Sequence, residues 1–329
     1  MPASQVIRRV GDAVVLFWLV VTLTFVLMHL APGNPATLLV PPDASPADVA
    51  RLRHAYGLDA PVLVQYARWI SALLRGDLGE SFATHVPVTA VLGAAAPISL
   101  GLGLASLLLT FVIGVPLGMC QGAHRNRAGD RLATVATTTV YAAPTFWLAL
   151  ALVAVFTYGA ATLGFPAWLR LPAFGVHTPG ASLAGWDAVR DVLRHSVLPV
   201  AILAAVGAAG IARYARSDVA DVLRQDFVQT AWAKGAGPAR VYARHVLASA
   251  APGLVVLFAL ALPGVVAGSI FVESVFAWPG LGRAMLQAIG ARDYPVVMAI
   301  TTAYAGTVIV ANLAADLVLP LLDPRQGRA

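Results

Sequence analysis

Long apolar runs alternate with shorter polar segments along the whole chain. The runs approach or exceed the roughly 20 residues that a helix needs to cross a bilayer. Because lipid offers the backbone no hydrogen-bonding partner, such spans are helical. The pattern therefore predicts an all-α polytopic membrane protein with six transmembrane helices. The predicted spans lie within residues 13–30, 97–121, 132–158, 196–212, 246–272 and 296–319.

The first polar interval, residues 32–96, is long enough to hold helices of its own. Residues 45–48 (Ser-Pro-Ala-Asp) form a good helix start, with a Ser cap, Pro at the first position and an acid at the third. Apolar residues at helical spacing predict a second helix over residues 62–74. Gly57 and Gly76 suit the ends of these helices. The segment is too small to hold a core alone, so we expect it on the surface of the bundle.

The most charged stretch, Ser217 to Pro252, lies between two predicted spans, so it is a loop in water. It is predicted to form two helices, because Gly235 suits the left-handed position after the first and Pro238 the first turn of the second. One helical projection places Val219, Val222, Leu223, Phe227, Thr230 and Ala231 on one face, and Val228 and Trp232 on the other. The helices could offer an exposed Trp to a soluble partner. The pattern alone favours an ordinary loop whose Trp packs on its own bundle.

Composition agrees with the membrane assignment. The 329 residues are 59% hydrophobic and 12% charged, against about 25% charged residues in soluble domains. The net charge of +6 is not a nucleic-acid signal, because the positive residues lie in loops that orient the chain. The single lysine, Lys234, is followed by Gly235, so the chain has no phosphate-binding Gly-Lys-Ser/Thr loop. If ATP drives the protein, another subunit binds it.

Basic residues predict the orientation of the spans. Arg8 and Arg9 precede the first apolar run, which is longer than the core of a signal peptide and lacks an Ala-x-Ala site after it, so we expect an uncleaved span. Lys and Arg are more numerous on the side that holds both termini and residues 213–244. That bias predicts cytoplasmic termini.

A local motif carries a family resemblance. Gln229-Thr230-Ala231, followed three residues later by Gly235, resembles the EAA loop of permeases from binding-protein-dependent ABC importers. Residues 225–247 (QDFVQTAWAKGAGPARVYARHVL) are similar to its dipeptide, oligopeptide and nickel subfamily. Two departures are Gln229 in place of an acid, and His245–Ala248 where the general family has Ile-x-Leu-Pro. Further segments resembling this subfamily are residues 29–39, 56–82 and 273–282.

The resemblance implies an inner-membrane permease subunit with the type I ABC importer fold. It implies a second homologous permease, two ATP-binding subunits that hold ATP and magnesium, and an extracytoplasmic substrate-binding protein as partners; it implies no cofactor in this chain. The expected cargo is peptides, with nickel or another small solute as the alternative. The implied ATPase-coupling residues are Phe227, Gln229, Thr230, Ala231, Trp232, Lys234 and Gly235. The implied regions are 1–31 (N-terminus and first span), 32–96 (extracytoplasmic helices), 97–322 (five spans with a coupling loop at about 213–248) and 323–329 (cytoplasmic tail).

Two acidic residues lie at or within predicted spans, where a charge must face protein or water. For Glu273 a role in the translocation path or gate and a role in stabilising the turn weigh equally. For Asp316, a structural role near the inner end of the sixth span is favoured over a path role. The segment from residue 273 to 282 resembles the last outer turn of the peptide subfamily. The candidate path or gate residues are Glu273, Trp278, Pro279 and Gly280.

Other chemistry has little support in the sequence. The seven histidines show no i, i+4 pair and no spacing typical of a metal site, and no hydrolase motif is present. The serious alternative is a secondary transporter driven by an ion gradient. Such a protein would show broken helices in two related halves and ionisable residues at mid-membrane, of which the chain has few.

Overall fold

The computed structural model describes residues 3–30, 45–55, 57–267 and 269–322, and within these residues the chain is helical with no strand. The predicted tail 323–329 and residues 31–44 lie outside the described residues. The long helices are α1 (Ala3–Leu30), α4 (Val88–Ala123), α5 (Ala128–Ala142), α7 (Gly185–Val222), α10 (Leu247–Ala267) and α13 (Tyr294–Leu322). The shorter helices are α2 (Pro46–Ala55), α3 (Val62–Leu74), α6 (Thr145–Val153), α8 (Asp226–Ala233), α9 (Pro238–Val241), α11 (Ile270–Val275) and α12 (Leu281–Gly290).

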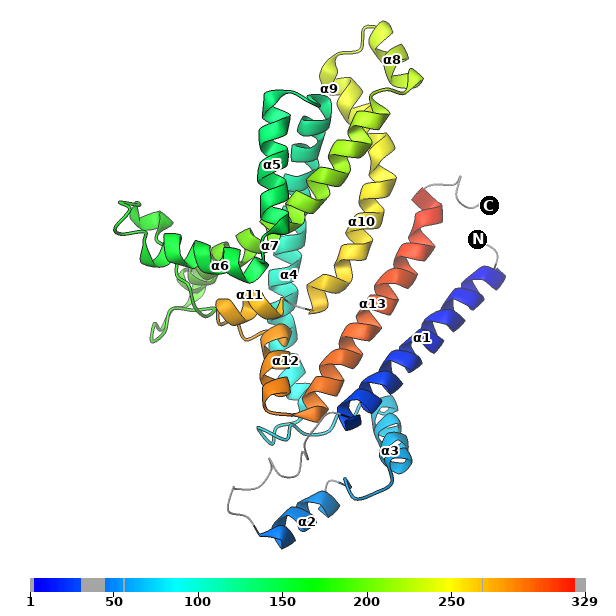
Figure 1. Ribbon diagram of the computed structural model, residues 1–329, viewed down its shortest axis with the longest axis vertical. Helices are drawn as coiled ribbons and strands as arrows, with labels where there is room; N and C mark the ends of the chain where they lie inside the picture. Colours follow the sequence, from blue (N-terminus) through cyan, green and yellow to red (C-terminus); the bar gives the residue numbers. More distant parts are fainter. Residues whose placement is uncertain (1–2, 31–44, 56, 268, 323–329) are drawn as a thin grey trace.

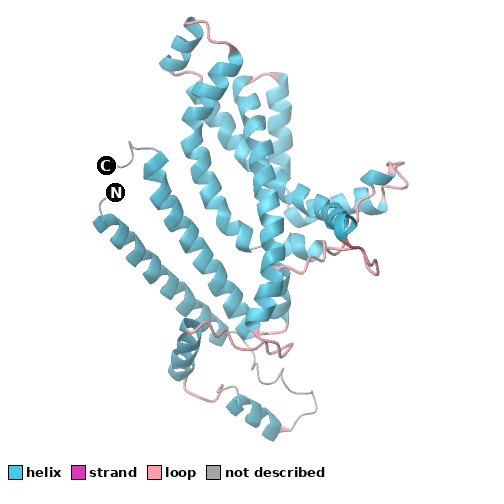
Figure 2. Cartoon of the chain, turned by 180° about the vertical axis from the view of Figure 1, so that it is seen from behind, coloured by secondary structure: helices cyan, strands magenta, loops and turns pink. Residues whose placement is uncertain are grey.

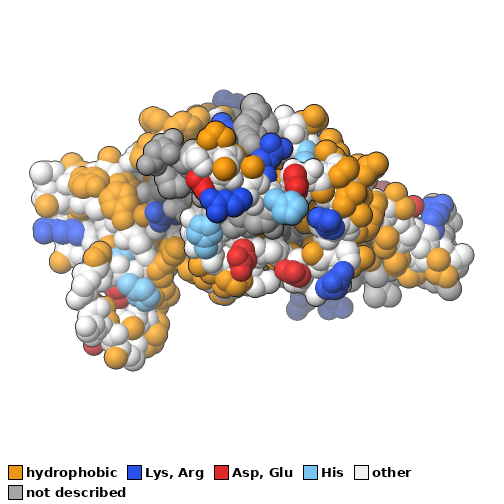
Figure 3. Space-filling view, turned by 90° about the horizontal axis from the view of Figure 1, so that it is seen from below, with side chains coloured by type: hydrophobic (Ala, Val, Ile, Leu, Met, Phe, Trp, Pro, Cys, Tyr) orange, Lys and Arg blue, Asp and Glu red, His pale blue; other side chains and the backbone are white. Residues whose placement is uncertain are grey.

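The long helices form an elongated bundle (Figures 1 and 2). Helix α8 lies at one end, which we call the α8 end, and α12 lies toward the other, which we call the α12 end. Helices α1 and α13 pack against each other and run in opposite directions, so the start of α1 and the end of α13 are neighbours. Viewed from the α12 end, charged and histidine side chains gather over the centre of the molecule, with hydrophobic side chains on both flanks (Figure 3).

The predicted spans are recovered with one correction. Five helices are long and apolar enough to cross a membrane, and a sixth span exists only if the bent pair α5 and α6 is counted as one. The predicted third span, residues 132–158, is therefore not a straight helix, because its halves meet at 102°. The bend lies at Pro144, which disfavours the helical conformation of the preceding residue, and Ala143 is extended (φ −72°, ψ 141°).

Two helices are longer than predicted. Helix α4 begins at Val88, so the expected boundary at residue 96 falls inside a helix that also accommodates Pro97 and Pro116. Helix α7 begins at Gly185 and extends to Val222, well past the predicted span 196–212 at both ends. The extension of α4, residues 88–96, is itself apolar, whereas the extensions of α7 carry charged residues at both ends.

A close contact between α4 and α7 explains a row of glycines. A Cβ on Gly118 would lie 2.5 Å from the carbonyl oxygen of Ala212, and one on Gly122 would lie 2.8 Å from that of Arg216. Gly114 meets the Ala208 carbonyl in the same way at 2.9 Å. Small residues at a spacing of four let two helix backbones approach, as is common between membrane helices.

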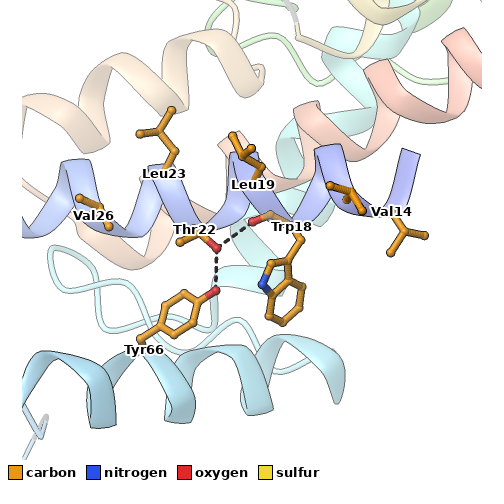
Figure 4. Close-up of a pocket in the computed structure, with 8 residues that line it drawn as sticks. Val14, Trp18, Leu19, Thr22, Leu23, Val26 and Tyr66 are labelled. Carbon is orange, nitrogen blue, oxygen red and sulfur yellow. Dashed lines mark hydrogen bonds between the residues drawn. The ribbon is translucent and has the colours of Figure 1, made fainter. Parts of the chain in front are cut away.

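The predicted surface helices α2 and α3 both form. Ser45 Oγ donates to Asp48 Oδ2 at 2.7 Å and accepts from the Asp48 amide at 3.2 Å, so Ser45 caps α2 and holds the pKa of Asp48 below its usual value. Helix α3 packs on α1, where the hydroxyls of Thr22 and Tyr66 lie 2.6 Å apart. A groove of about 700 Å³ beside this contact is lined by apolar α1 residues (Figure 4).

Candidate functional site

Helix α8 is a short helix set across the end of the bundle, after a turn that ends α7 at Val222. Gln225 precedes it in an extended conformation, and Asp226 supplies an acid in its first turn. Gly235 follows it at φ +78°, with the amides of Gly235 and Ala236 bonded back to the carbonyls of Trp232 and Ala231. The helix–Gly–helix prediction is therefore confirmed.

The predicted faces of this segment are wrong. Val228 is completely buried and Ala231 nearly so, while Phe227 is 46% exposed and Thr230 is also exposed. The projection failed because it ran one helix through the turn between α7 and α8, whereas the turn resets the helical phase. Trp232 is half-buried against an apolar cluster, as the ordinary-loop interpretation predicted. The buried members of that cluster are Val219, Val228, Ala231, Val241 and Val246.

The candidate coupling residues therefore fall into two groups. Ala231 and Trp232 seat α8 on the cluster shared with α7 and the start of the next span, while Gly235 ends the helix. The side chain of Gln229 is exposed and donates to the Leu223 carbonyl at 3.0 Å. The exposed group comprises Phe227, Gln229, Thr230 and Lys234.

An ion pair braces the bundle close to α8. Arg216 on α7 donates from Nε to Asp130 Oδ1 at 2.7 Å and from its terminal nitrogen to Oδ2 at 2.8 Å. Asp130 is 3% exposed, and its Oδ2 also accepts from the Asn126 amide at 2.8 Å. The sequence analysis missed this pair. The available signal was an acid and a base placed where long helices leave the apolar part of the bundle.

The second candidate place is the turn after α11, and Glu273 holds it together. Its side chain is completely buried and accepts from Ser99 Oγ at 2.8 Å and from the Arg283 amide at 3.0 Å. Ser99 in turn accepts from the Leu281 amide at 2.8 Å. A Cβ on Gly280 would lie 2.6 Å from Glu273 Oε2, so glycine is required there. These contacts are the turn-stabilising role that was one of the two expectations for Glu273.

The other candidate path residues differ in exposure. Trp278 is 5% exposed, and its amide bonds to the Glu273 carbonyl at 2.8 Å. Its ring nitrogen has no acceptor within the part of the chain that the structure describes. Pro279 is exposed and Gly280 is buried. Ala277, just before Trp278, adopts φ +53°, a conformation that L-residues hold only when neighbouring contacts fix it. The side chain of Asp316 lies outside the described residues.

A third buried carboxylate, which the sequence did not reveal, joins two segments far apart in the chain. Asp293 is 2% exposed and accepts from the Phe82 amide at 3.0 Å, the Ala83 amide at 3.3 Å and the Ser81 hydroxyl. It ties the connection before α4 to the turn between α12 and α13. Among the described residues, no group of three His, Cys, Asp or Glu side chains is arranged to hold a metal ion.

Comparisons with known proteins cover nearly the whole chain. The family model "Binding-protein-dependent transport system inner membrane component" matches residues 114–328, and the N-terminal model of the same systems matches residues 3–103. An oligopeptide transport system permease protein, AppB of Bacillus subtilis, is 36% identical over 98% of this chain and 99% of its own length. OppB of Mycobacterium tuberculosis, also named an oligopeptide transport system permease, is 35% identical over 97% of this chain and 97% of its own length.

A third relative is the probable D,D-dipeptide transport system permease DdpB of Escherichia coli, which is 35% identical over 94% of this chain and 93% of its own. The helical bundle and its span pattern agree with the type I permease fold of this family. The chain belongs to the family of inner-membrane components of binding-protein-dependent transport systems, and it is an ABC importer permease subunit.

Proposed function

We propose that this chain forms one half of the translocation path of a peptide importer in the bacterial inner membrane, with its α8 end in the cytoplasm. The peptide cargo is supported by the names of the relatives, which are oligopeptide and dipeptide permeases. The orientation is supported by the excess of basic residues at the termini and in the α7–α10 connection. A second permease, two ATP-binding subunits and an extracytoplasmic binding protein complete the complex.

The exposed face of α8 is the coupling surface to the ATP-binding subunits. The observation that carries this proposal is that α8 has one buried and one exposed face. Val228 is buried, whereas the neighbouring residue Phe227 is 46% exposed. A helix seated by one face and free on the other suits docking into a groove. ATP and magnesium are held by the partner subunits, because this sequence has no phosphate-binding loop.

The packing beneath α8 gives the mechanism. The apolar cluster under α8 includes Val219 of α7 and Val246, which leads into α10. Closure of the ATP-binding subunits moves α8 as a rigid body, and this shared cluster passes the movement to α7 and α10. The two helices also line the cavity beside Glu273 near the α12 end. ATP binding at one end therefore alters the path at the other, which is alternating access.

Co-purification with the ATP-binding subunits tests this proposal, using two matched variants. Phe227→Ala is compared with Phe146→Ala, because these side chains are 46% and 45% exposed and each has one tilted ring contact. We expect Phe227→Ala to reduce capture about tenfold or more, as loss of an aromatic anchor does. Phe146→Ala captures as wild type does.

Two results would contradict the proposal. Equal capture by the two phenylalanine variants would remove the coupling role of the α8 face. Uptake into vesicles that runs on an ion gradient without ATP would instead favour the secondary transporter. To distinguish these two results, the hydrolysis of ATP by the reconstituted complex is measured with and without the binding protein.

A further inference from the structure

A small, partly open cavity adjoins the buried Glu273. Its volume is about 130 Å³, and it lies between α4, α7, α10 and the start of α11. Apolar residues of the spans form most of its wall. The polar side chains that line it are Ser99, Ser106, Ser269 and Glu273. The wall is thus mostly apolar, with one carboxylate and three hydroxyls among its lining residues.

The carboxylate has no cationic partner. Within the described part of the chain, no Lys or Arg pairs with Glu273, and the nearby Arg283 side chain donates to the Ala277 carbonyl at 2.7 Å. The side chain of Glu273 accepts both of its hydrogen bonds, from the Ser99 hydroxyl and the Arg283 amide. Buried charges in proteins are normally paired. The cavity is where a partner could enter.

The hydroxyls of Ser99 and Ser106 have only acceptor capacity left toward the cavity. Ser99 gives its proton to Glu273, and Ser106 gives its proton to the Leu102 carbonyl at 2.7 Å. A hydroxyl has one proton but two lone pairs, so these oxygens can accept further hydrogen bonds. A ligand that only donates fits such a lining. A primary ammonium group has three donors, no acceptor and a positive charge.

We propose that this cavity receives the ammonium group of the cargo, with Glu273 as its counter-ion. The proposal rests on the proposed function as a peptide permease. The volume is that of about four water molecules at 30 Å³ each, which admits an amino group with its first carbons but not a whole peptide. The side chains of the cargo stay outside, so one site serves peptides of many sequences that share a free amino terminus.

The test uses the purified complex of this chain with its partner permease and ATP-binding subunits in lipid nanodiscs. The probe is glycinamide, with N-acetylglycinamide as the analogue that lacks the ammonium group. We expect glycinamide, and not its acetylated form, to raise the melting temperature saturably. Glu273→Gln abolishes this response, and Ser106→Ala raises the half-saturating concentration about tenfold, because a hydrogen bond to a charged group is lost.

Two matched glycine substitutions allow the proposal to be tested even if the Glu273→Gln complex fails to assemble. Gly264 and Gly101 are both helical glycines with open space where a Cβ would lie, but only Gly264 lines the cavity. Gly264→Ala narrows the cavity and weakens the response, whereas Gly101→Ala leaves it unchanged. An equal weakening by both substitutions would overturn the proposal.

The remaining outcomes are distinct. Sodium or potassium chloride that reproduces the shift at equal concentration would make the cavity an inorganic cation site and overturn the ammonium proposal. The absence of any saturable shift, in a complex that still hydrolyses ATP in response to the binding protein, would also overturn it while the permease function stands. Failure to capture ATP-binding subunits would instead refute the proposed function.

Discussion

Arg216 and Asp130 form a two-point ion pair, at 2.7 and 2.8 Å, that fastens the first turn of α5 to α7 near the end of α7. The guanidinium and carboxylate planes match, which adds geometric specificity to the attraction. The pair therefore fixes the direction in which α7 presents the coupling segment.

Asp130→Asn tests this brace. The substitution keeps the shape of the side chain and removes the charge that Arg216 binds, so we expect a loss of about 1.5–3 kcal/mol in the free energy of unfolding. The melting temperature in detergent measures it. Asp187→Asn, at an exposed acid in the first turn of α7, is the control and changes little. Equal shifts in the two variants would show that the brace carries no stability.

Val228→Ala and Thr230→Ala separate the seated and free faces of α8. Val228 is completely buried, so removing two methyl groups is expected to cost about 2 kcal/mol and to lower the melting temperature. Thr230 is exposed, so its substitution leaves stability unchanged and weakens capture of the ATP-binding subunits. The reverse assignment of the two effects would refute the observed seating of the helix.

Gly235→Ala and Gly237→Ala isolate a backbone effect. Neither glycine has an atom within 4 Å of an added Cβ, but Gly235 has φ +78° and Gly237 has φ −69°. We expect Gly235→Ala to cost about 1–2 kcal/mol locally and to reduce coupled ATP hydrolysis, whereas Gly237→Ala is neutral. The ratio of transport to hydrolysis is the measurement, and identical ratios in the two variants would contradict the assigned role.

Gly118→Ala tests the approach of α4 to α7. The added methyl meets the Ala212 carbonyl at 2.5 Å, so we expect overpacking to cost about 1–3 kcal/mol. Gly101→Ala on the same helix meets nothing and is expected to stabilise slightly through helix propensity. We therefore expect Gly118→Ala to lower the melting temperature relative to wild type and Gly101→Ala to raise it slightly. A stabilised Gly118→Ala protein would mean that the helices are farther apart.

Asp293→Asn tests the tie between the segment before α4 and the α12–α13 turn. The carboxylate accepts from the amides of Phe82 and Ala83, and an amide side chain has one acceptor oxygen in place of two. We expect faster hydrogen exchange at these two amides, with α8 unaffected. Asp77→Asn, at an exposed acid, is the control. Unchanged exchange at Phe82 would contradict the tie.

Local sequence signals were enough for the spans, the capped surface helices and the Gly235 turn. Each depends on composition or on one residue type, such as the left-handed conformation at Gly235 or the Ser45 cap. The faces of α8 could not be read in the same way, because the turn after Val222 breaks the helical period. A projection needs one continuous helix.

Contacts across the bundle were beyond single-sequence reasoning. Glu273 meets Ser99, and Asp293 meets Ser81, across separations of 174 and 212 residues. Periodicity says that such acids must be satisfied, but it does not name the donor. The sequence therefore located the turn at Glu273 in the chain, whereas the partners of Glu273 required the three-dimensional arrangement.

The 102° bend after α5 has a consequence for the surrounding lipid. Helix α5 has 15 residues, so it rises about 22 Å, against a hydrocarbon core of about 30 Å. The chain turns sideways through α6 before completing the crossing. Hydrophobic mismatch of this size is relieved by local thinning of the bilayer. The permease is therefore expected to transport fastest in bilayers of short-chain lipids and more slowly as the acyl chains lengthen. The lipid composition of the host membrane would then influence its transport rate.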